Sequence, residues 1–404
     1  MKVLQINSFF SVGGPPRIMN GIYTTLTENG HECKIAASRE KILFPDDSIM
    51  IGKPRDTYIN AIKSRIFDSD GFLAKKNTKE LIARIKVYNP DIIQIHNLHG
   101  YYIDAEVLFK YLKKCGKPVV WTLHDCWPMT GHCAYFSFAK CNMYINGCGH
   151  CIQKKSYPSS FVFDKSRKNW IKKRIVFSDV PNMTFVTPSK WLANIVKTSY
   201  LQSYPVNVIN NGIDLKQFAN SPGQLRKKYQ LSGKKIVLGV AQNWSEHKGY
   251  EDFIQLAQTL SAEYQVVMIG LTDKQLKALP VNILGLKRTN SIEELVEWYS
   301  NAQVFVNLTY QDNFPTVNIE ALACGTPIIT YNTGGSPEAI DESCGWVVEQ
   351  GNVEKVASII QSMGDKQQYQ DKAIARSKSF DRKTKYLEYI NLYQDMMNKA
   401  EGNK

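Results

Sequence analysis

The sequence has no continuous run of about 20 apolar residues, the length that a helix needs to cross a membrane. Its first residues, MKVLQINSFF, carry one lysine and a short apolar run that Asn7 interrupts. This pattern favours a first β-strand over a secretory signal peptide. Internal repeats and long low-complexity segments are also missing, which argues against repeat and disordered architectures. We therefore expect a cytoplasmic globular protein.

Acidic residues are scarce relative to basic ones, with 37 Asp and Glu against 50 Lys and Arg, a net charge of +13. Such an excess indicates an anionic substrate, an anionic membrane surface, nucleic acid, or only a basic surface. Part of it is local, because residues 165–174, KSRKNWIKKR, hold six basic residues around Trp170 and Ile171. This segment is compatible with contact to anionic lipid headgroups at the inner face of the cell membrane, and equally with the solvated face of an ordinary helix.

The chain length of 404 residues suits two domains, each with its own core. We predict one domain at residues 1–212 and a second at residues 213–380. Residues 381–404 are predicted to form a C-terminal helix that packs back on the first domain. The aromatic, Cys-rich and basic stretch at 126–180 interrupts the pattern of the first domain and is interpreted as an insertion.

Short apolar runs alternate with helical patterns in both halves of the chain. Examples are the strand pattern at Val3–Ile6 followed by a helix near Pro16–Thr27, and Ile236–Val240 followed by Tyr250–Leu260. This alternation predicts the α/β class, with two doubly wound, Rossmann-like domains. Ser291 is predicted to cap a further helix. Because ligands bind at the carboxyl ends of such strands, we expect the two domains to face a central cleft.

The most informative segment spans residues 310–338, YQDNFPTVNIEALACGTPIITYNTGGSPE. A helix is predicted to begin just after Phe314-Pro315-Thr316, and its first N–H groups would be free to hold phosphate oxygens. Glu320, one turn into that helix, can accept two hydroxyl hydrogens, as ribose recognition requires. Asp312, on the preceding loop, can do the same for a sugar.

This segment resembles the signature of glycosyltransferase family 4, whose members are retaining enzymes of the GT-B fold. The family pattern E-x7-E is present with Asp312 in the first acidic position and Glu320 in the second. Other segments agree in order along nearly the whole chain, and residues 124–135 resemble exopolysaccharide enzymes of the colanic-acid type. The matching residues include Phe314, Ala321, Ala323, Cys324, Gly325, Pro327, Gly334, Gly335, Pro337, Glu338, Gly13, Gly14, Leu123, His124, Asp125, Thr187, Pro188, Ser189, Lys248, Gly249 and the run Val208–Asp214.

The resemblance implies that residues 1–212 form the acceptor-side domain and residues 213–380 the nucleotide-sugar-binding domain. It also implies roles for individual residues. Lys248 would neutralise the diphosphate of the sugar donor, Glu320 would bind its ribose, and Asp312 would position the transferred sugar. His124 would lie beside the reacting carbon and offer its backbone carbonyl or its ring to a sugar hydroxyl. The remaining residues implied in donor binding are Gly13, Gly14, Asn243, Lys287, Asn313, Phe314, Pro315, Thr316 and Val317; Pro315 has no N–H to offer.

Two departures from the family pattern affect the donor site. The family has an arginine five residues before the lysine, and here Asn243 stands in that position, so Lys287, Arg288 or Arg17 would have to supply the second cation. Aspartate in place of glutamate at position 312 shortens the reach to the sugar by one methylene. The identity of the donor sugar therefore stays open.

The implied reaction moves a sugar from a nucleoside diphosphate to a hydroxyl of a glycan or a lipid-linked acceptor, in capsular polysaccharide, exopolysaccharide or lipopolysaccharide assembly. Negative charge builds on the leaving diphosphate, and a cation with a helix N-terminus can stabilise it, so no cofactor is expected for catalysis. The alternatives are a sugar-nucleotide 2-epimerase of the same fold and a basic nucleic-acid-binding zinc protein. The second leaves the motifs of residues 310–338 unexplained, and we expect no nucleic-acid partner.

Five of the nine cysteines fall within residues 126–151. Cys133, Cys141, Cys148 and Cys151 form a candidate structural zinc site, because Cys148 and Cys151 make a CxxC pair. Two other interpretations remain open, namely reduced cysteines that pack the insertion and disulfide or redox chemistry. The acidic triplet Asp68-Ser69-Asp70 has the DxD form of metal-dependent glycosyltransferases, but it lies in a polar loop outside the matched motifs and we assign it no role.

Overall fold

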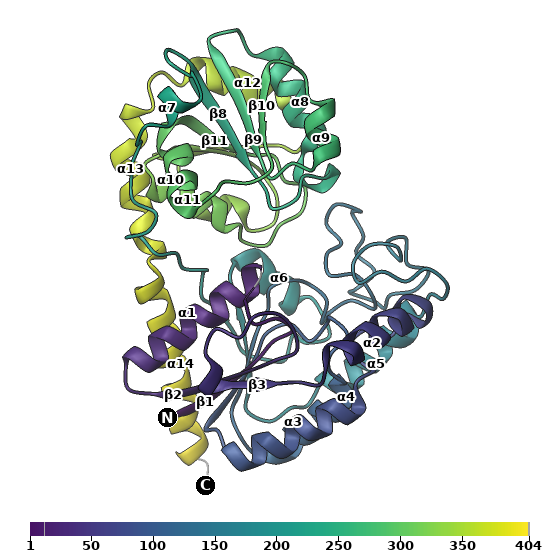
Figure 1. Ribbon diagram of the computed structural model, residues 1–404. Coiled ribbons are helices and arrows are strands. Elements are labelled where there is room, and N and C mark those ends of the chain that lie inside the picture. Colours follow the sequence, from purple (N-terminus) through teal and green to yellow (C-terminus); the bar gives the residue numbers. More distant parts are fainter. Residues whose placement is uncertain (12, 403–404) are drawn as a thin grey trace. The chain divides into compact units, whose positions relative to one another are not determined.

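The computed structural model describes residues 1–11 and 13–402, and the chain divides into two compact units (Figure 1). Unit 1 holds Met1–Asn210 together with the C-terminal residues from Lys385 onward, and unit 2 holds Asn211–Thr384. The long helix α14 (Arg382–Gly402) begins in unit 2 and runs on in unit 1.

Unit 1 is built on a seven-stranded sheet in the order β3-β2-β1-β4-β5-β6-β7, and every pairing is parallel. The central strands are continuous buried runs, as expected for a parallel sheet covered on both faces. The strands are β1 (Lys2–Ile6), β2 (Glu32–Ala37), β3 (Ser48–Met50), β4 (Ile92–Ile95), β5 (Val119–Thr122), β6 (Met183–Thr187) and β7 (Val206–Val208).

Helices cover both faces of the unit 1 sheet (Figure 1). Successive strand residues point to opposite faces, so that Val3 and Ile92 join one core while Leu4 and Ile93 join the other. The helices are α1 (Gly14–Glu28), α2 (Pro54–Phe67), α3 (Lys75–Tyr88), α4 (Ala105–Cys115), α5 (Ser166–Phe177) and α6 (Lys190–Lys197), with the short 3-10 turn η1 (Pro45–Asp47).

The helix α14 packs on unit 1 through three buried tyrosines and Ile390. Its Tyr386 lies so close to Gly21 of α1 that a Cβ at Gly21 would come within 2.2 Å of the tyrosine ring. Glycine at this position therefore permits the two helices to approach. The hydroxyl of Tyr393 donates to Gln94 of β4, which ties the end of the chain to the centre of the sheet.

Residues 126–165 contain no helix or strand, yet they are well packed. Trp127, Met129, Cys133, Phe136 and Tyr144 all belong to the core on the α3–α4 side of the sheet. The aromatic side chains of this stretch therefore extend the core of unit 1.

Unit 2 repeats the same architecture with six parallel strands in the order β10-β9-β8-β11-β12-β13. The strands are β8 (Lys235–Val240), β9 (Tyr264–Ile269), β10 (Ile283–Leu286), β11 (Ala302–Asn307), β12 (Ile328–Tyr331) and β13 (Gly345–Val348). The helices are α7 (Leu225–Lys228), α8 (Tyr250–Thr259), α9 (Asp273–Ala278), α10 (Ile292–Asn301), α11 (Thr316–Ala323), α12 (Val353–Ser362) and α13 (Gln367–Ser377), with 3-10 turns η2 (Glu246–Lys248), η3 (Ser336–Ala339) and η4 (Lys378–Phe380).

The helix α10 begins as the sequence predicts, with Ser291 as N-cap. The Ser291 hydroxyl accepts the N–H of Glu294 at 3.2 Å. The Glu294 carboxylate accepts the N–H of Asn290 at 2.7 Å, whereas in a capping box it would accept the N–H of the N-cap residue, Ser291.

Each sheet reverses its strand order at one point, between β1 and β4 in unit 1 and between β8 and β11 in unit 2. In open α/β sheets this reversal opens a crevice at the carboxyl ends of the strands, where ligands bind. The loops after β1, β4, β8 and β11 are therefore the first places to look for function. In the part of the chain that the structure describes, no helix has the length and apolarity needed to cross a bilayer.

Candidate active site

Lys248 and Asp312 meet at the reversal point of the unit 2 sheet. The Lys248 ammonium lies 2.6 Å from Oδ2 of Asp312, and both side chains are only partly exposed. Lys248 comes from the loop after β8 and Asp312 from the loop after β11. The structure thus brings together the residue predicted to neutralise a diphosphate and the residue predicted to position a sugar.

The loop carrying Lys248 is fixed against the loop after β11. Gly249 adopts φ 72°, and a Cβ there would lie 2.3 Å from the carbonyl oxygen of Leu308. Only glycine allows this approach, which places Lys248 beside the following loop. The carbonyl of His247 accepts the N–H of Tyr310 at 2.9 Å and holds the same contact from the other side.

The residues between Asp312 and Glu320 form the entry to α11. Asn313 and Phe314 are buried, and the side-chain amide of Asn211 donates to the Phe314 carbonyl at 3.1 Å. The helix begins at Thr316 with Pro315 as N-cap and no side-chain cap. The N–H of Asn318 already bonds the Pro315 carbonyl at 3.2 Å, but those of Thr316 and Val317 precede the first bond within the helix and are suited to hold an anion.

Glu320 lies in the second turn of α11 and is 3% exposed. One of its carboxylate oxygens accepts the hydroxyl of Tyr299 at 3.1 Å, which fixes the orientation of the carboxylate. Next to it, Asn318 joins α11 to the GGSPE segment through the Ser336 hydroxyl at 2.9 Å. The predicted role of Glu320 in ribose binding stays a prediction.

The contacts of the candidate residues do not single out a second cation for the diphosphate of the donor. Asn243 is exposed in the loop after β8. Lys287 follows β10, which β9 separates from β8, and its ammonium is paired with Asp273. Arg17 lies in unit 1, exposed in the first turns of α1. The role of Lys287 as the second cation stays a prediction.

Gly13 and Gly14 occupy the reversal point of unit 1, after β1. Gly13 has φ 101°, a conformation that favours glycine, and Gly14 is the first residue of α1. A Cβ on either glycine would meet nothing within 4 Å, so the backbone is open to a close neighbour. This geometry agrees with the predicted approach of a phosphate.

His124 follows β5 and is half-buried in unit 1. Its backbone carbonyl already accepts the Tyr135 hydroxyl at 3.0 Å, and its ring Nε2 lies 2.9 Å from Nδ1 of His96. Burial lowers the pKa of His124 to about 4, against the opposing effect of Asp125. The ring of His124 is therefore neutral near pH 7, and it is a better candidate than the carbonyl for contact with a sugar.

Two further histidines, His96 and His99, were not predicted from the sequence. Nε2 of His99 lies 2.7 Å from the Asp125 carboxylate, which outweighs burial and raises the pKa of His99. His99 in turn holds the pKa of Asp125 below its usual range although burial opposes this. Both histidines follow β4 at the reversal point of the sheet. Because ligands bind at the carboxyl ends of such strands, the position of these residues in the sequence could have indicated them.

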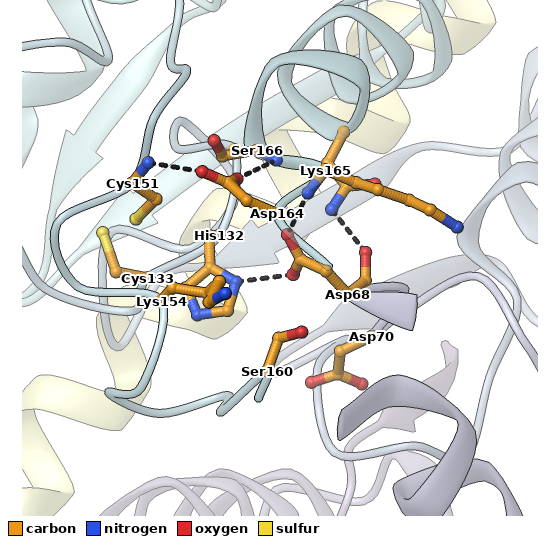
Figure 2. Close-up of polar contacts among 12 residues, drawn as sticks. Asp68, Asp70, His132, Cys133, Cys151, Lys154, Ser160, Asp164, Lys165 and Ser166 are labelled. Atoms are coloured by element: carbon orange, nitrogen blue, oxygen red, sulfur yellow. Dashed lines mark hydrogen bonds and ion pairs between the residues drawn. The ribbon is translucent and has the colours of Figure 1, made fainter. Parts of the chain in front are cut away.

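Asp68 and Asp70 have structural contacts. Figure 2 shows Asp68 between His132, at 2.5 Å, and the backbone N–H of Lys165, at 2.8 Å. Asp70 accepts the N–H groups of Gly100 and Tyr101 at 3.1 and 2.9 Å. These buried carboxylates hold loops of unit 1 together, which explains the acidic triplet without a metal role.

The clustered cysteines form no disulfide within the described residues. The interaction of Cys133 with Cys151 lowers the pKa of the Cys151 thiol and raises that of the Cys133 thiol. The N–H of Gly131 donates to Sγ of Cys148 at 3.2 Å. Within residues 1–11 and 13–402, no group of three or more His, Cys, Asp or Glu is arranged to hold a metal ion. The zinc site, with Cys141 as fourth ligand, stays a prediction.

We expect Cys148→Ala to lower the free energy of unfolding by about 1–3 kcal/mol, because the Gly131 N–H loses its acceptor. Chemical denaturation measures this loss, and elemental analysis of the purified protein measures zinc. Cys115→Ala, at the end of α4, is the control and should cost less. Stoichiometric zinc that is lost in the variant would support the zinc site, whereas unchanged stability would contradict the role of Cys148.

The basic segment 165–174 forms most of α5, and its central aromatic residue faces inward. Trp170 is 5% exposed and its indole N–H donates to the Tyr144 carbonyl at 3.0 Å. Lys173 is 1% exposed and donates to the Trp127 carbonyl at 2.8 Å. Trp170 therefore packs in the core and does not itself reach lipid headgroups, and contact of the segment 165–174 with an anionic membrane stays a prediction.

Two parallel, doubly wound units with these strand-end loops define a GT-B glycosyltransferase. The model of the Glycosyltransferase Family 4 matches residues 12–217, and that of the Glycosyl transferases group 1 matches residues 223–380. The chain therefore belongs to glycosyltransferase family 4 and is a glycosyltransferase, as the resemblance implies. Both matches favour sugar transfer over the epimerase and nucleic-acid alternatives.

Among curated proteins, the chain is 24% identical to the colanic acid biosynthesis glycosyl transferase WcaC of Escherichia coli K12, over 89% of this chain and 90% of WcaC. Among solved structures, it resembles sucrose-phosphate synthase from Thermosynechococcus elongatus, with a TM-score of 0.73, 16% identity and coverage of 98% and 99%. HepE of Anabaena in complex with UDP gives a TM-score of 0.69 at 15% identity, covering 98% of this chain and all of HepE. These likenesses confirm the GT-B fold.

Proposed function

We propose that the protein transfers a sugar from a nucleoside diphosphate to a hydroxyl of a glycan or lipid-linked acceptor, with retention of the anomeric configuration. The contact between Lys248 and Asp312, beside the start of α11, carries this proposal. A diphosphate would attract the ammonium of Lys248 and the first N–H groups of α11. Asp312 would then be available to the hydroxyls of the sugar.

In the proposed step, the bond between the anomeric carbon and the diphosphate oxygen breaks, and its electron pair goes to the diphosphate. The acceptor oxygen bonds the anomeric carbon on the same face, and its proton passes to the leaving phosphate oxygen. Lys248 and the helix dipole of α11 stabilise the developing negative charge, which is the largest contribution available to the protein.

The named relatives support a place in surface polysaccharide assembly. WcaC is named for colanic acid biosynthesis. A Campylobacter jejuni enzyme, 27% identical over 42% of this chain and 47% of its own length, is named for N-acetylgalactosamine transfer to a diphospho-undecaprenol lipid. HepE has been crystallised with UDP and UDP-glucose, which makes UDP the first nucleotide to test.

The donor is identified by thermal unfolding with UDP, GDP and ADP, followed by hydrolysis assays with the matching sugar nucleotides. A ligand at 100 times its Kd stabilises the folded protein by about 2.7 kcal/mol, so the correct nucleotide raises Tm by several degrees. We expect one nucleotide to stand out. If none changes Tm at millimolar concentration, the proposed donor site is wrong.

A patch on unit 1 is suited to contact an anionic membrane in place of Trp170. Phe67, Phe161, Val162 and Phe163 are 44–60% exposed, and Phe67 stacks on Phe163 with ring centroids 5.8 Å apart. Backbone hydrogen bonds join the strip to the end of α2, from Phe163 to Ile66 at 3.1 Å and from Phe161 to Arg65 at 2.7 Å. Exposed aromatic side chains fixed in one strip are typical of peripheral membrane contacts.

Lysines border this apolar patch. The Lys165 ammonium lies 5.3 Å from the centre of the Phe67 ring, and Lys154 donates to the Val162 carbonyl at 3.1 Å. We therefore expect binding to vesicles that contain phosphatidylglycerol and not to neutral vesicles. Phe161→Ser combined with Val162→Ser should reduce sedimentation with anionic vesicles several-fold. Val87→Ser, at an 88% exposed position on α3, is the matched control, and equal binding of both variants would refute the patch.

A further inference from the structure

A chain of buried hydrogen bonds links His124 to the helix α1. The side-chain amide nitrogen of Gln5 donates to the carbonyl of Met19 at 3.1 Å. Oε1 of Gln5 lies 3.1 Å from Nε2 of His96, and Nδ1 of His96 lies 2.9 Å from Nε2 of His124. Gln5 and His96 are 0% and 1% exposed, so water does not compete for these contacts.

The Met19 carbonyl sets the direction of every bond in this chain. A carbonyl oxygen can only accept, so the NH₂ group of Gln5 must face Met19 and its oxygen must face His96. Nε2 of His96 therefore carries a hydrogen. In a neutral imidazole the other nitrogen is then bare, and Nδ1 of His96 accepts a hydrogen from Nε2 of His124.

His96 and His124 are both neutral near pH 7, as this chain requires. Burial, aided by the neighbouring His124, holds the pKa of His96 well below its usual range, and burial lowers the pKa of His124. The charged pair nearby is a separate one, formed by His99 and Asp125. With its hydrogen on Nε2, His124 carries no hydrogen on Nδ1, so this atom can only accept a hydrogen bond.

We propose that Gln5 and His96 are positioning residues that hold His124 as the Nε2–H tautomer, so that Nδ1 accepts a hydrogen bond from a hydroxyl of the reacting sugars. This inference rests on the proposed sugar transfer and on the role that the family resemblance implies for His124, beside the reacting carbon of the sugar. In this state His124 can recognise a hydroxyl but cannot donate to a phosphate through Nδ1. A sugar carboxylate at the same place would be repelled by the lone pair.

The tautomer is measurable without any activity. With ¹⁵N-labelled histidine, the chemical shifts of the ring nitrogens distinguish a protonated from a bare nitrogen, and the sequence has only seven histidines. The variants His96→Gln and His124→Gln assign the signals. At pH 7 we expect protonated Nε2 and bare Nδ1 in both residues. A hydrogen on Nδ1 of His124 would overturn the inference.

Gln5→Leu and Gln94→Leu form a matched pair, because the two buried glutamines face each other in register on β1 and β4. Gln94 bonds Thr122 and Tyr393 and is not part of the chain to His124. Gln5→Leu removes the acceptor of His96, so we expect the histidine signals to shift and kcat to fall about tenfold, the effect of one hydrogen bond. Gln94→Leu should lower Tm about as much as Gln5→Leu does and leave the histidine signals unchanged.

The two measurements separate the tautomer from the proposed function. If Gln5→Leu lowers kcat no more than Gln94→Leu does, or leaves the His124 signals unchanged, Gln5 is not a positioning residue and the inference fails. If the expected tautomer is found while His124→Ala retains full transfer, the placement of His124 beside the sugar fails, and with it the role assigned to Nδ1.

Discussion

Lys248→Ala is expected to reduce kcat/KM about 100- to 1000-fold, the usual cost of removing one group that stabilises charge in a transition state. Lys248 is the cation found next to Asp312 and the loop before α11. Without Lys248, only the first N–H groups of α11 would stabilise the negative charge that develops on the leaving diphosphate. Steady-state assays with the identified sugar nucleotide measure the effect.

Lys235→Ala is the control for Lys248→Ala. Lys235 stands at the other end of β8, and its ammonium lies 3.0 Å from a carboxylate oxygen of Glu263. This variant loses an exposed ion pair of the same kind, at the sheet edge opposite the site. We expect its activity to stay within about twofold of wild type, since exposed ion pairs contribute roughly 0–1 kcal/mol. Near-normal kcat/KM in Lys248→Ala would show that another group holds the diphosphate.

Glu320→Gln is expected to reduce kcat/KM about 10- to 100-fold, because a charged acceptor of the ribose hydroxyls becomes a neutral one. Glu320→Ala is a poorer test, because it would remove the carboxylate that accepts the buried Tyr299 hydroxyl, at a cost of about 1–3 kcal/mol. Glutamine keeps the volume and an oxygen for Tyr299.

Tyr299→Phe separates folding from binding at this position. It removes the same hydrogen bond while it keeps the carboxylate of Glu320. We expect a loss of roughly 1 kcal/mol in the free energy of unfolding and a small change in kcat/KM. If Glu320→Gln binds and turns over the donor as wild type does, Glu320 has only the structural role that its bond to Tyr299 shows.

The fold was predictable because local patterns agree with the tertiary structure. Alternating apolar runs and helical patterns indicate two parallel sheets, and both are present. Ser291 begins α10 as expected, because its hydroxyl satisfies an N–H of the first turn. The meeting of Lys248 and Asp312 followed from the resemblance, since 64 residues separate them in the sequence.

What the sequence could not indicate depends on contacts between distant residues. Trp170 stands among six basic residues in the sequence, yet it is buried, and the Tyr144 carbonyl accepts its indole N–H. Lys287 is a free cation in the sequence, but Asp273 pairs with it in the structure. The bond between His96 and His124 joins the ends of two strands, and only the order of the strands brings these residues together.

A structure of the enzyme with the nucleoside diphosphate that raises its Tm tests the central claim most directly. We expect a diphosphate oxygen within hydrogen-bond distance of Lys248 Nζ and of the first N–H groups of α11, with the ribose at Glu320. A nucleotide bound elsewhere in the chain, with the Lys248–Asp312 contact unchanged, would contradict the assignment of this site.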